Sequence, residues 1–157
     1  EVGADVVRYF FLMRGMNTHL NFDMDLARDE SDENPVYYLQ YAYARLCNIL
    51  KHAKSIGYEL NDNIDLTSSY LKSEIQLIIN LMEFPSIVER AHGTLEPQSI
   101  ANYLQELAGQ FHRYYAKERV VSDDLEKTAF RLKLVKALKI VLYNGVNILG
   151  INAPERM

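Results

Sequence analysis

The chain has 157 residues, 48% hydrophobic and 24% charged, which is the composition of one globular domain and excludes a disordered or membrane-spanning protein. No apolar run approaches the roughly 20 residues of a membrane span and no leader opens the chain, so we expect a cytoplasmic monomer with no membrane partner. The single cysteine, Cys47, excludes an internal disulfide and a multi-cysteine zinc cluster.

The formal net charge of −4 argues against a nucleic-acid partner, but the charges are unevenly distributed. Residues 1–35 contain eight acids and three bases, which gives −5, whereas residues 36–157 contain thirteen acids and fourteen bases, which gives +1. Within residues 111–140 there are eight bases and four acids, which gives +4. The sequence therefore allows a local basic patch with a modest number of phosphate contacts.

Apolar residues recur at spacings of three and four almost everywhere after residue 34, which predicts an all-α fold. The first predicted helix covers residues 4–14 and ends at Gly15 in a left-handed conformation. Residues 17–33 are rich in acids and are predicted to form a solvated linker with one helical turn. These acids lack the spacing and the central glycine of a calcium-binding loop, so we expect no metal site.

The clearest helix is predicted to begin at Pro35 and to end near Gly57. Asn34 precedes it and is suited to cap its free backbone N–H groups, and proline suits the first helical position because no N–H is needed there. A polar turn at residues 61–65 is followed by a second long helix. This helix is predicted to start at residue 67 or 68, to break or kink at Pro85 and to continue to Ala91.

Two further helices complete the predicted fold. The third opens at residues 96–98 and has an apolar face that includes Leu104 and Phe111. The fourth begins after Ser122, which forms an approximate capping signature, and runs to Leu149. Long helices with short connections predict an antiparallel helical bundle.

One face of the helix that begins at Pro35 carries large side chains that a hydrophobic core does not require. Tyr38, Tyr41 and Arg45 lie roughly 100° to 160° from the stripe of apolar core residues. Unpaired nucleic-acid bases stack on aromatic rings and on guanidinium planes, which is worth about 1 to 3 kcal/mol per base. The face is therefore a candidate nucleic-acid site, although the spacing alone favours the alternative that the tyrosines pack beneath the next helix.

A second group of aromatic and basic residues ends the third predicted helix. Tyr114 and Tyr115 lie about 50° to either side of its apolar face, so one of them is expected to be buried and the other exposed. Arg113, Lys117 and Arg119 are candidate phosphate contacts, and a solvated helix face explains these bases equally well. The chain contains no glycine-rich phosphate loop, no paired metal-ligand spacing and no serine elbow, so we expect no catalytic residue and no cofactor in it.

The longest motif is Asn34-Pro35-Val36-Tyr37-Tyr38-Leu39-Gln40-Tyr41-Ala42-Tyr43-Ala44-Arg45. It resembles the start of the anticodon-binding domain of arginyl-tRNA synthetases, where the pattern Asn-Pro-x-x-Tyr-x-Gln-Tyr-Ala-x-x-Arg is typical. Residues 3–12 and 20–27 resemble the end of the catalytic domain in this class I family, and residues 142–157 resemble its C-terminus. The resemblance thus covers essentially the whole chain. It implies that residues 1–33 are the end of the catalytic domain with a linker, and that residues 34–157 are the helical anticodon-binding domain.

The resemblance also implies a partner and site residues. The family binds the anticodon stem-loop of tRNA(Arg), recognises chiefly its central cytosine and stacks aromatic residues on splayed bases. By motif position, Tyr38, Tyr41, Arg45 and Tyr115 would belong to that surface, and the terminal Met157 would pack at the same site. The parent enzyme attaches arginine to its tRNA with ATP and magnesium. The His-x-Gly-His and Lys-Met-Ser-Lys-like elements are absent from this chain, so we do not expect it to catalyse that reaction by itself. The alternative from another class of function is a helical domain whose tyrosine face binds a partner protein.

Overall fold

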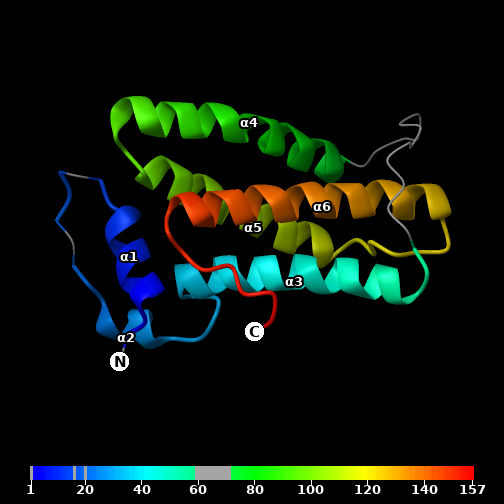
Figure 1. Ribbon diagram of the computed structural model, residues 1–157, viewed down its shortest axis with the longest axis horizontal. Helices are drawn as coiled ribbons and strands as arrows, with labels where there is room; N and C mark the ends of the chain where they lie inside the picture. Colours follow the sequence, from blue (N-terminus) through cyan, green and yellow to red (C-terminus); the bar gives the residue numbers. More distant parts are fainter. Residues whose placement is uncertain (1, 16, 20, 59–71) are drawn as a thin grey trace.

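Four long helices lie side by side and form the bundle that the apolar spacing predicts (Figure 1). They are α3 (Pro35–Ser55), α4 (Lys72–Thr94), α5 (Gln98–Tyr115) and α6 (Leu125–Ile148), and two shorter helices, α1 (Ala4–Leu12) and α2 (Met24–Arg28), precede them. This computed structural model describes residues 2–15, 17–19, 21–58 and 72–157. Within these ranges every element of regular secondary structure is helical, so the all-α prediction is confirmed.

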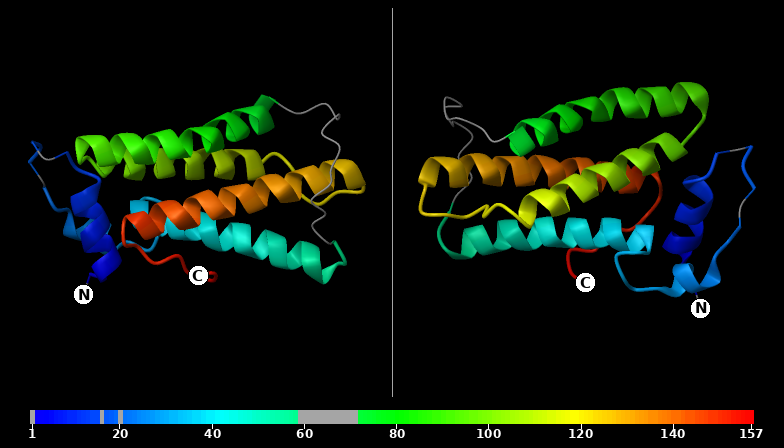
Figure 2. Two further views of the ribbon diagram at one scale, coloured as in Figure 1. Left: turned by 45° about the horizontal axis from the view of Figure 1, so that its top comes forward. Right: turned by 180° about the vertical axis from the view of Figure 1, so that it is seen from behind.

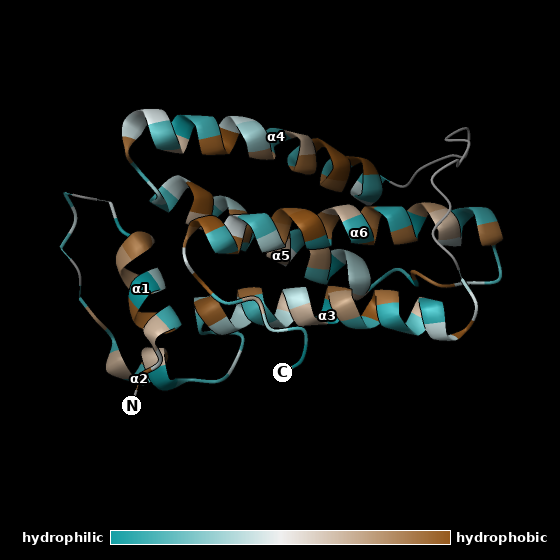
Figure 3. Ribbon diagram, viewed as in Figure 1, coloured by the Kyte–Doolittle hydropathy of each residue, from teal (hydrophilic) through white to brown (hydrophobic). Residues whose placement is uncertain are grey.

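Successive long helices run in opposite directions, and α5 and α6 lie between α3 and α4 (Figure 1, Figure 2). Each long helix carries both hydrophobic and hydrophilic residues (Figure 3). The apolar side chains meet in one core, whose members include Leu39, Leu46, Leu104, Phe111 and Leu138. A stretch that could cross a membrane is not found among the described helices.

Helix α1 packs against the first turns of α3 and α5. Tyr9 and Phe10 are buried in the same core as the bundle residues. The hydroxyl of Tyr9 donates a hydrogen bond to the carbonyl of Ala101 (3.2 Å) and accepts one from Nε2 of Gln105 (3.0 Å). Residues before position 34 therefore contribute to the packing of the bundle, and the division of the chain into two parts at residue 33 stays a prediction.

Both ends of α3 contain the residues that the sequence predicts. Oδ1 of Asn34 accepts hydrogen bonds from the N–H groups of Val36 (3.1 Å) and Tyr37 (3.5 Å), and its Nδ2 donates to the carbonyl of Asp29 (2.8 Å). At the other end Gly57 has a φ of 87°, a left-handed conformation that glycine adopts without steric cost. The helix is thus closed at each end by a residue suited to that position.

The predicted end of the first helix is wrong. Helix α1 ends at Leu12, and Gly15 is not among the described glycines with a left-handed φ. A Cβ at position 15 would lie 2.9 Å from Oε1 of Gln98, so close packing against α5 favours glycine there. The predicted single turn in the acidic segment is confirmed as α2, whose first N–H groups are capped by the carboxylate of Asp23.

Two further boundaries differ from the prediction. Of the predicted break or kink at Pro85, the break is not found: helix α4 continues through Pro85 to Thr94, because apolar side chains before and after the proline pack on the core and hold the helix. Helix α6 is capped by Asp124, whose carboxylate accepts a hydrogen bond from the N–H of Lys127 (3.0 Å). The N–H of Ser122 instead donates to the hydroxyl of Thr128 (3.0 Å). The predicted turn at residues 61–65 and the predicted start of the helix after it lie outside the described residues.

The C-terminal tail returns along α3 after the end of α6 (Figure 1). Gly150 has a φ of 68°, which turns the chain, and Ile151 is buried. Nε2 of Gln40 donates a hydrogen bond to the carbonyl of Asn152 (3.0 Å). Nζ of Lys51 lies 2.7 Å from a carboxylate oxygen of Glu155. These contacts bring the last residues of the chain to the surface of α3.

Candidate nucleic-acid interface

A surface hollow of about 690 Å³ lies between α3, the end of α5, the loop after it and the C-terminus. We call it the tyrosine hollow, and its lining includes Tyr41, Arg45, Asn48, Tyr115, Arg119 and Met157. Tyr41 is 38% exposed, Tyr115 is 37% exposed and Met157 is 52% exposed. Four of the five residues expected from the sequence at one site therefore converge there, from three separate parts of the chain.

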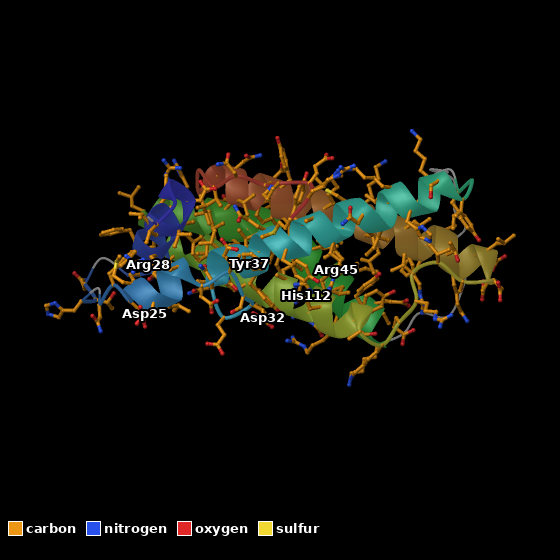
Figure 4. All side chains as sticks on the ribbon, turned by 90° about the horizontal axis from the view of Figure 1, so that it is seen from below. Asp25, Arg28, Asp32, Tyr37, Arg45 and His112 are labelled. Atoms are coloured by element: carbon orange, nitrogen blue, oxygen red, sulfur yellow. The ribbon has the colours of Figure 1, made fainter. Side chains whose placement is uncertain are left out.

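Arg45 occupies the centre of this group. Its Cζ lies 4.5 Å from the ring centroid of Tyr41 and 5.4 Å from that of Tyr115, both within the range of a cation–π interaction. One terminal nitrogen donates a hydrogen bond to the hydroxyl of Tyr41, and the other lies 3.3 Å from Nδ1 of His112. The side chains of Arg45 and His112 come from neighbouring helices and lie close together (Figure 4). The two terminal nitrogens of the guanidinium thus contact Tyr41 and His112, and its Cζ lies near the rings of Tyr41 and Tyr115.

Tyr38 lies beside the hollow and does not line it. It is half-buried between α3 and α5, with its ring centroid 4.7 Å from that of His112, so the alternative of packing beneath the next helix describes this residue in part. Burial raises the pKa of Tyr38. A Cβ at position 109 would lie 3.5 Å from the Tyr38 hydroxyl and 3.2 Å from a guanidinium nitrogen of Arg113, so Gly109 leaves room for both side chains.

The structure resolves the ambiguity at the end of α5. Tyr114 is buried, and its hydroxyl donates a hydrogen bond to Oε1 of Glu74 (3.0 Å), whereas Tyr115 is exposed in the tyrosine hollow. The spacing predicted that one of the two is buried, and the neighbouring helices decide which one.

The three candidate phosphate contacts are exposed but do not form one cluster. Arg119 lines the tyrosine hollow. Arg113 and Lys117 line a smaller hollow of about 310 Å³ between α4 and α5. Arg131, another base of the 111–140 segment, is only 7% exposed and is paired with Glu74, so it is withdrawn from any basic surface.

Two residues of this region were not singled out by the sequence patterns. The ring of Tyr37 is stacked on that of Tyr41, with centroids 6.4 Å apart and an interplanar angle of 14°. His112 is surrounded by the rings of Tyr38, Tyr41 and Phe111, with centroid distances of 4.7, 5.8 and 5.5 Å. The spacing of three residues between His112 and Tyr115 places them on one side of α5 and was a signal available in the sequence.

The charge of His112 is fixed by its surroundings. Burial and the nearby Arg45 guanidinium lower the pKa of His112 to about 4. The imidazole is therefore neutral at neutral pH, and its Nδ1 lone pair is free to accept a hydrogen bond from Arg45.

Comparisons with known proteins agree on one family. Residues 39–157 match the family model described as the DALR anticodon binding domain. An arginine–tRNA ligase from Salinibacter ruber is 43% identical over 157 residues and one from Geotalea daltonii is 46% identical over 159 residues; each alignment covers 100% of this chain and 28% of the relative. The Thermus thermophilus arginyl-tRNA synthetase structure superposes with a TM-score of 0.84 at 28% identity, covering 98% of this chain and 26% of that one. The chain thus spans little more than a quarter of the length of these relatives.

Proposed function

The chain belongs to the DALR anticodon-binding domain family, and from this premise we propose that the tyrosine hollow binds unstacked bases of the anticodon loop of tRNA(Arg). The observation that carries the proposal is the convergence of Tyr41, Tyr115 and Met157 around Arg45 in one exposed hollow. Its volume falls within the range of about 300 to 1,000 Å³ typical of small-molecule sites. One or two bases turned out of a loop match such a site.

The chemistry of the hollow suits a base better than a helical segment of protein. Flat rings and a guanidinium plane offer stacking surfaces, which contribute about 1 to 3 kcal/mol per base. Arg45 has five N–H groups, of which two are engaged by the hydroxyl of Tyr41 and by His112 among the described residues. Its other N–H groups are donors for the acceptor atoms on the pairing edge of a base, and the central cytosine carries two such acceptors.

Binding should depend on salt, but weakly. Arg113, Lys117 and Arg119 are exposed and provide three candidate phosphate contacts, and each neutralised phosphate of a single strand contributes about −0.7 to the slope of log K against log salt. Three contacts give a slope of about −2. A net charge of −4 over the whole chain is compatible with so few phosphate contacts.

The parent enzyme in this proposal is a cytoplasmic, monomeric arginyl-tRNA synthetase that attaches arginine to its tRNA with ATP and magnesium. The chain contributes tRNA binding and not the chemical step. It therefore determines how tightly the parent enzyme binds tRNA and which tRNA it selects.

Titration of the 157-residue chain with an anticodon stem-loop tests the proposal. We expect tight binding to the loop with a central cytosine and weaker binding when uracil replaces it. Tyr41→Ala should weaken binding by about 1 to 3 kcal/mol, which is roughly 5-fold to 160-fold in Kd. Tyr143→Ala is the matched control, because Tyr143 is a 46% exposed tyrosine that does not line the hollow. Equal affinity for the two loops, or equal losses in the two variants, would refute the proposal.

A further inference from the structure

His112 is a polar side chain in a position that an apolar one would fill. It lies half-buried between α3 and α5, in contact with the rings of Tyr38, Tyr41 and Phe111. Its Nδ1 lies 3.3 Å from a terminal nitrogen of Arg45. Its Nε2 is buried and forms no hydrogen bond of ordinary geometry among the described residues, and the backbone of Tyr38 makes a weaker hydrogen-bonding contact with the ring that raises the pKa of His112 against the larger effect of burial.

The partner atom fixes the tautomer of His112. A guanidinium only donates hydrogen bonds, so Nδ1 must carry a lone pair and the ring proton must be on Nε2. The lowered pKa of His112 is consistent with this neutral form. The Nε2 proton is then a buried donor that has only a weak backbone contact, to Tyr38, and such a poorly satisfied donor is unfavourable for the folded state.

Packing alone does not account for a histidine at this position. Phenylalanine has a similar ring, would contact the same three aromatic neighbours and would bury no poorly satisfied donor. What histidine adds is the Nδ1 acceptor for Arg45. We therefore attribute the histidine at this position to its hydrogen bond with Arg45.

The rings around Arg45 do not fix the rotation of its guanidinium group within its own plane, and His112 does. Tyr41 and Tyr115 attract the guanidinium to their rings, and a cation–π interaction depends weakly on rotation of the guanidinium within its own plane. Hydrogen bonds at two of its nitrogens, to the hydroxyl of Tyr41 and to Nδ1 of His112, define that rotation. They also determine which N–H groups remain directed into the hollow.

We propose that His112 is a positioning residue that holds the Arg45 guanidinium in one rotation, and that this rotation gives the tyrosine hollow its preference among bases. The inference rests on the proposed function of the hollow. His112 acts through Arg45, and its loss reduces selectivity more than it reduces overall affinity. An arginine free to rotate still stacks and still attracts a base, but it presents its donors to any pairing edge.

Two variants separate the acceptor from the ring. His112→Phe keeps a ring of similar size and removes the acceptor, whereas His112→Asn keeps an acceptor at the position of Nδ1. Both are titrated with stem-loops that carry central cytosine or central uracil. We expect His112→Phe to reduce the preference for cytosine roughly tenfold, the size of a hydrogen bond to a charged group, and His112→Asn to retain most of it. Should the phenylalanine variant fail to fold, His112→Leu removes the acceptor in the same way.

The role through Arg45 is tested in the same experiment. In the Arg45→Ala background, His112→Phe should cause no additional loss of preference. A further loss of equal size there would overturn the inference, and so would an unchanged preference in His112→Phe on the wild-type background. If the wild-type chain itself shows no preference, both the proposed function and this inference fail. If it prefers cytosine and His112→Phe does so equally, this inference alone fails.

Discussion

Replacing Arg131 by methionine tests how the bundle below the tyrosine hollow is held together. Arg131 of α6 is buried, with its Nε 2.8 Å from Oε1 of Glu74 in α4 and a terminal nitrogen 3.0 Å from Oε2 of Glu118. Its other terminal nitrogen donates a hydrogen bond of 2.7 Å to the carbonyl of Arg119. Arg131→Met keeps the length and the apolar part of the side chain and removes all three contacts.

The expected cost follows from the burial of the Glu74 carboxylate. Removing one partner of a buried ion pair costs about 3 to 5 kcal/mol, because the other charge is left uncompensated. The side chain of Glu74 is 4% exposed and keeps the hydrogen bond from the Tyr114 hydroxyl, which offsets part of that cost, whereas the side chain of Glu118 is 29% exposed and can be hydrated. We therefore expect a loss of about 3 kcal/mol in the free energy of unfolding.

Urea denaturation followed by circular dichroism measures this loss. Lys136→Met on the same helix is the matched control, because Lys136 is exposed, and it should change the free energy of unfolding by less than about 0.5 kcal/mol. The double variant Glu74→Leu, Arg131→Met should be more stable than Arg131→Met, since it removes the buried carboxylate together with its cationic partner. A loss below about 1 kcal/mol in Arg131→Met, or a double variant as unstable as the sum of its parts, would refute this account.

Two further predictions concern stability. The pKa of His112 is lowered to about 4 in the folded chain. Between about pH 6.5 and 4 the unfolded chain therefore binds a proton that the folded chain does not. The free energy of unfolding must fall as the pH falls through that window. Because the ring is partly exposed, we expect the free energy of unfolding to fall by on the order of 1 to 2 kcal/mol. Urea unfolding of the wild type and of His112→Phe at pH 7 and pH 4.5 measures this fall. Parallel pH profiles of the two proteins would contradict it. Gly145→Ala should destabilise the bundle by about 1 kcal/mol in thermal unfolding, because a Cβ there would lie 2.4 Å from Cδ2 of Leu104 and the crowding outweighs the helix preference of alanine. Gly93→Ala, where a Cβ would meet nothing within 4 Å, should be neutral or stabilising, and equal effects at the two glycines would show that crowding is not the cause.

Local patterns predicted the helices because their signals lie within a few residues of one another. The cap at Asn34 and the apolar stripe of α3 depend on spacings of two to four residues, and the structure contains both as predicted. The continuous path of α4 through Pro85 was not predictable in this way, because what holds the helix there is packing against the core. The side of α5 on which a tyrosine is buried likewise depends on Glu74, 40 residues away.

The sequence indicated most residues of the candidate site but not how these residues contact one another. Tyr41 and Arg45 stand on a visible second face of α3, and their meeting with Tyr115 requires the packing of α3 on α5. The same packing brings His112 to Arg45, a contact across 67 positions for which no spacing rule exists. Tyr38 and Tyr41 are only three residues apart, yet the position of α5 half-buries the first between the helices and leaves the second in the hollow.

The position of Met157 depends on both ends of the chain. A free C-terminal residue is normally frayed, but this tail is attached to α1 before it reaches the hollow. The carboxylate of Asp5 accepts hydrogen bonds from the backbone N–H (3.2 Å) and from Nδ2 (3.3 Å) of Asn152, and Arg8 donates to the carbonyl of Gly150. Because α1 is part of the same hydrophobic core as α3 and α5, it is a fixed support for the tail. The position of Met157 at the hollow therefore depends on the contacts of Asp5 and Arg8 in α1 with Asn152 and Gly150 of the tail.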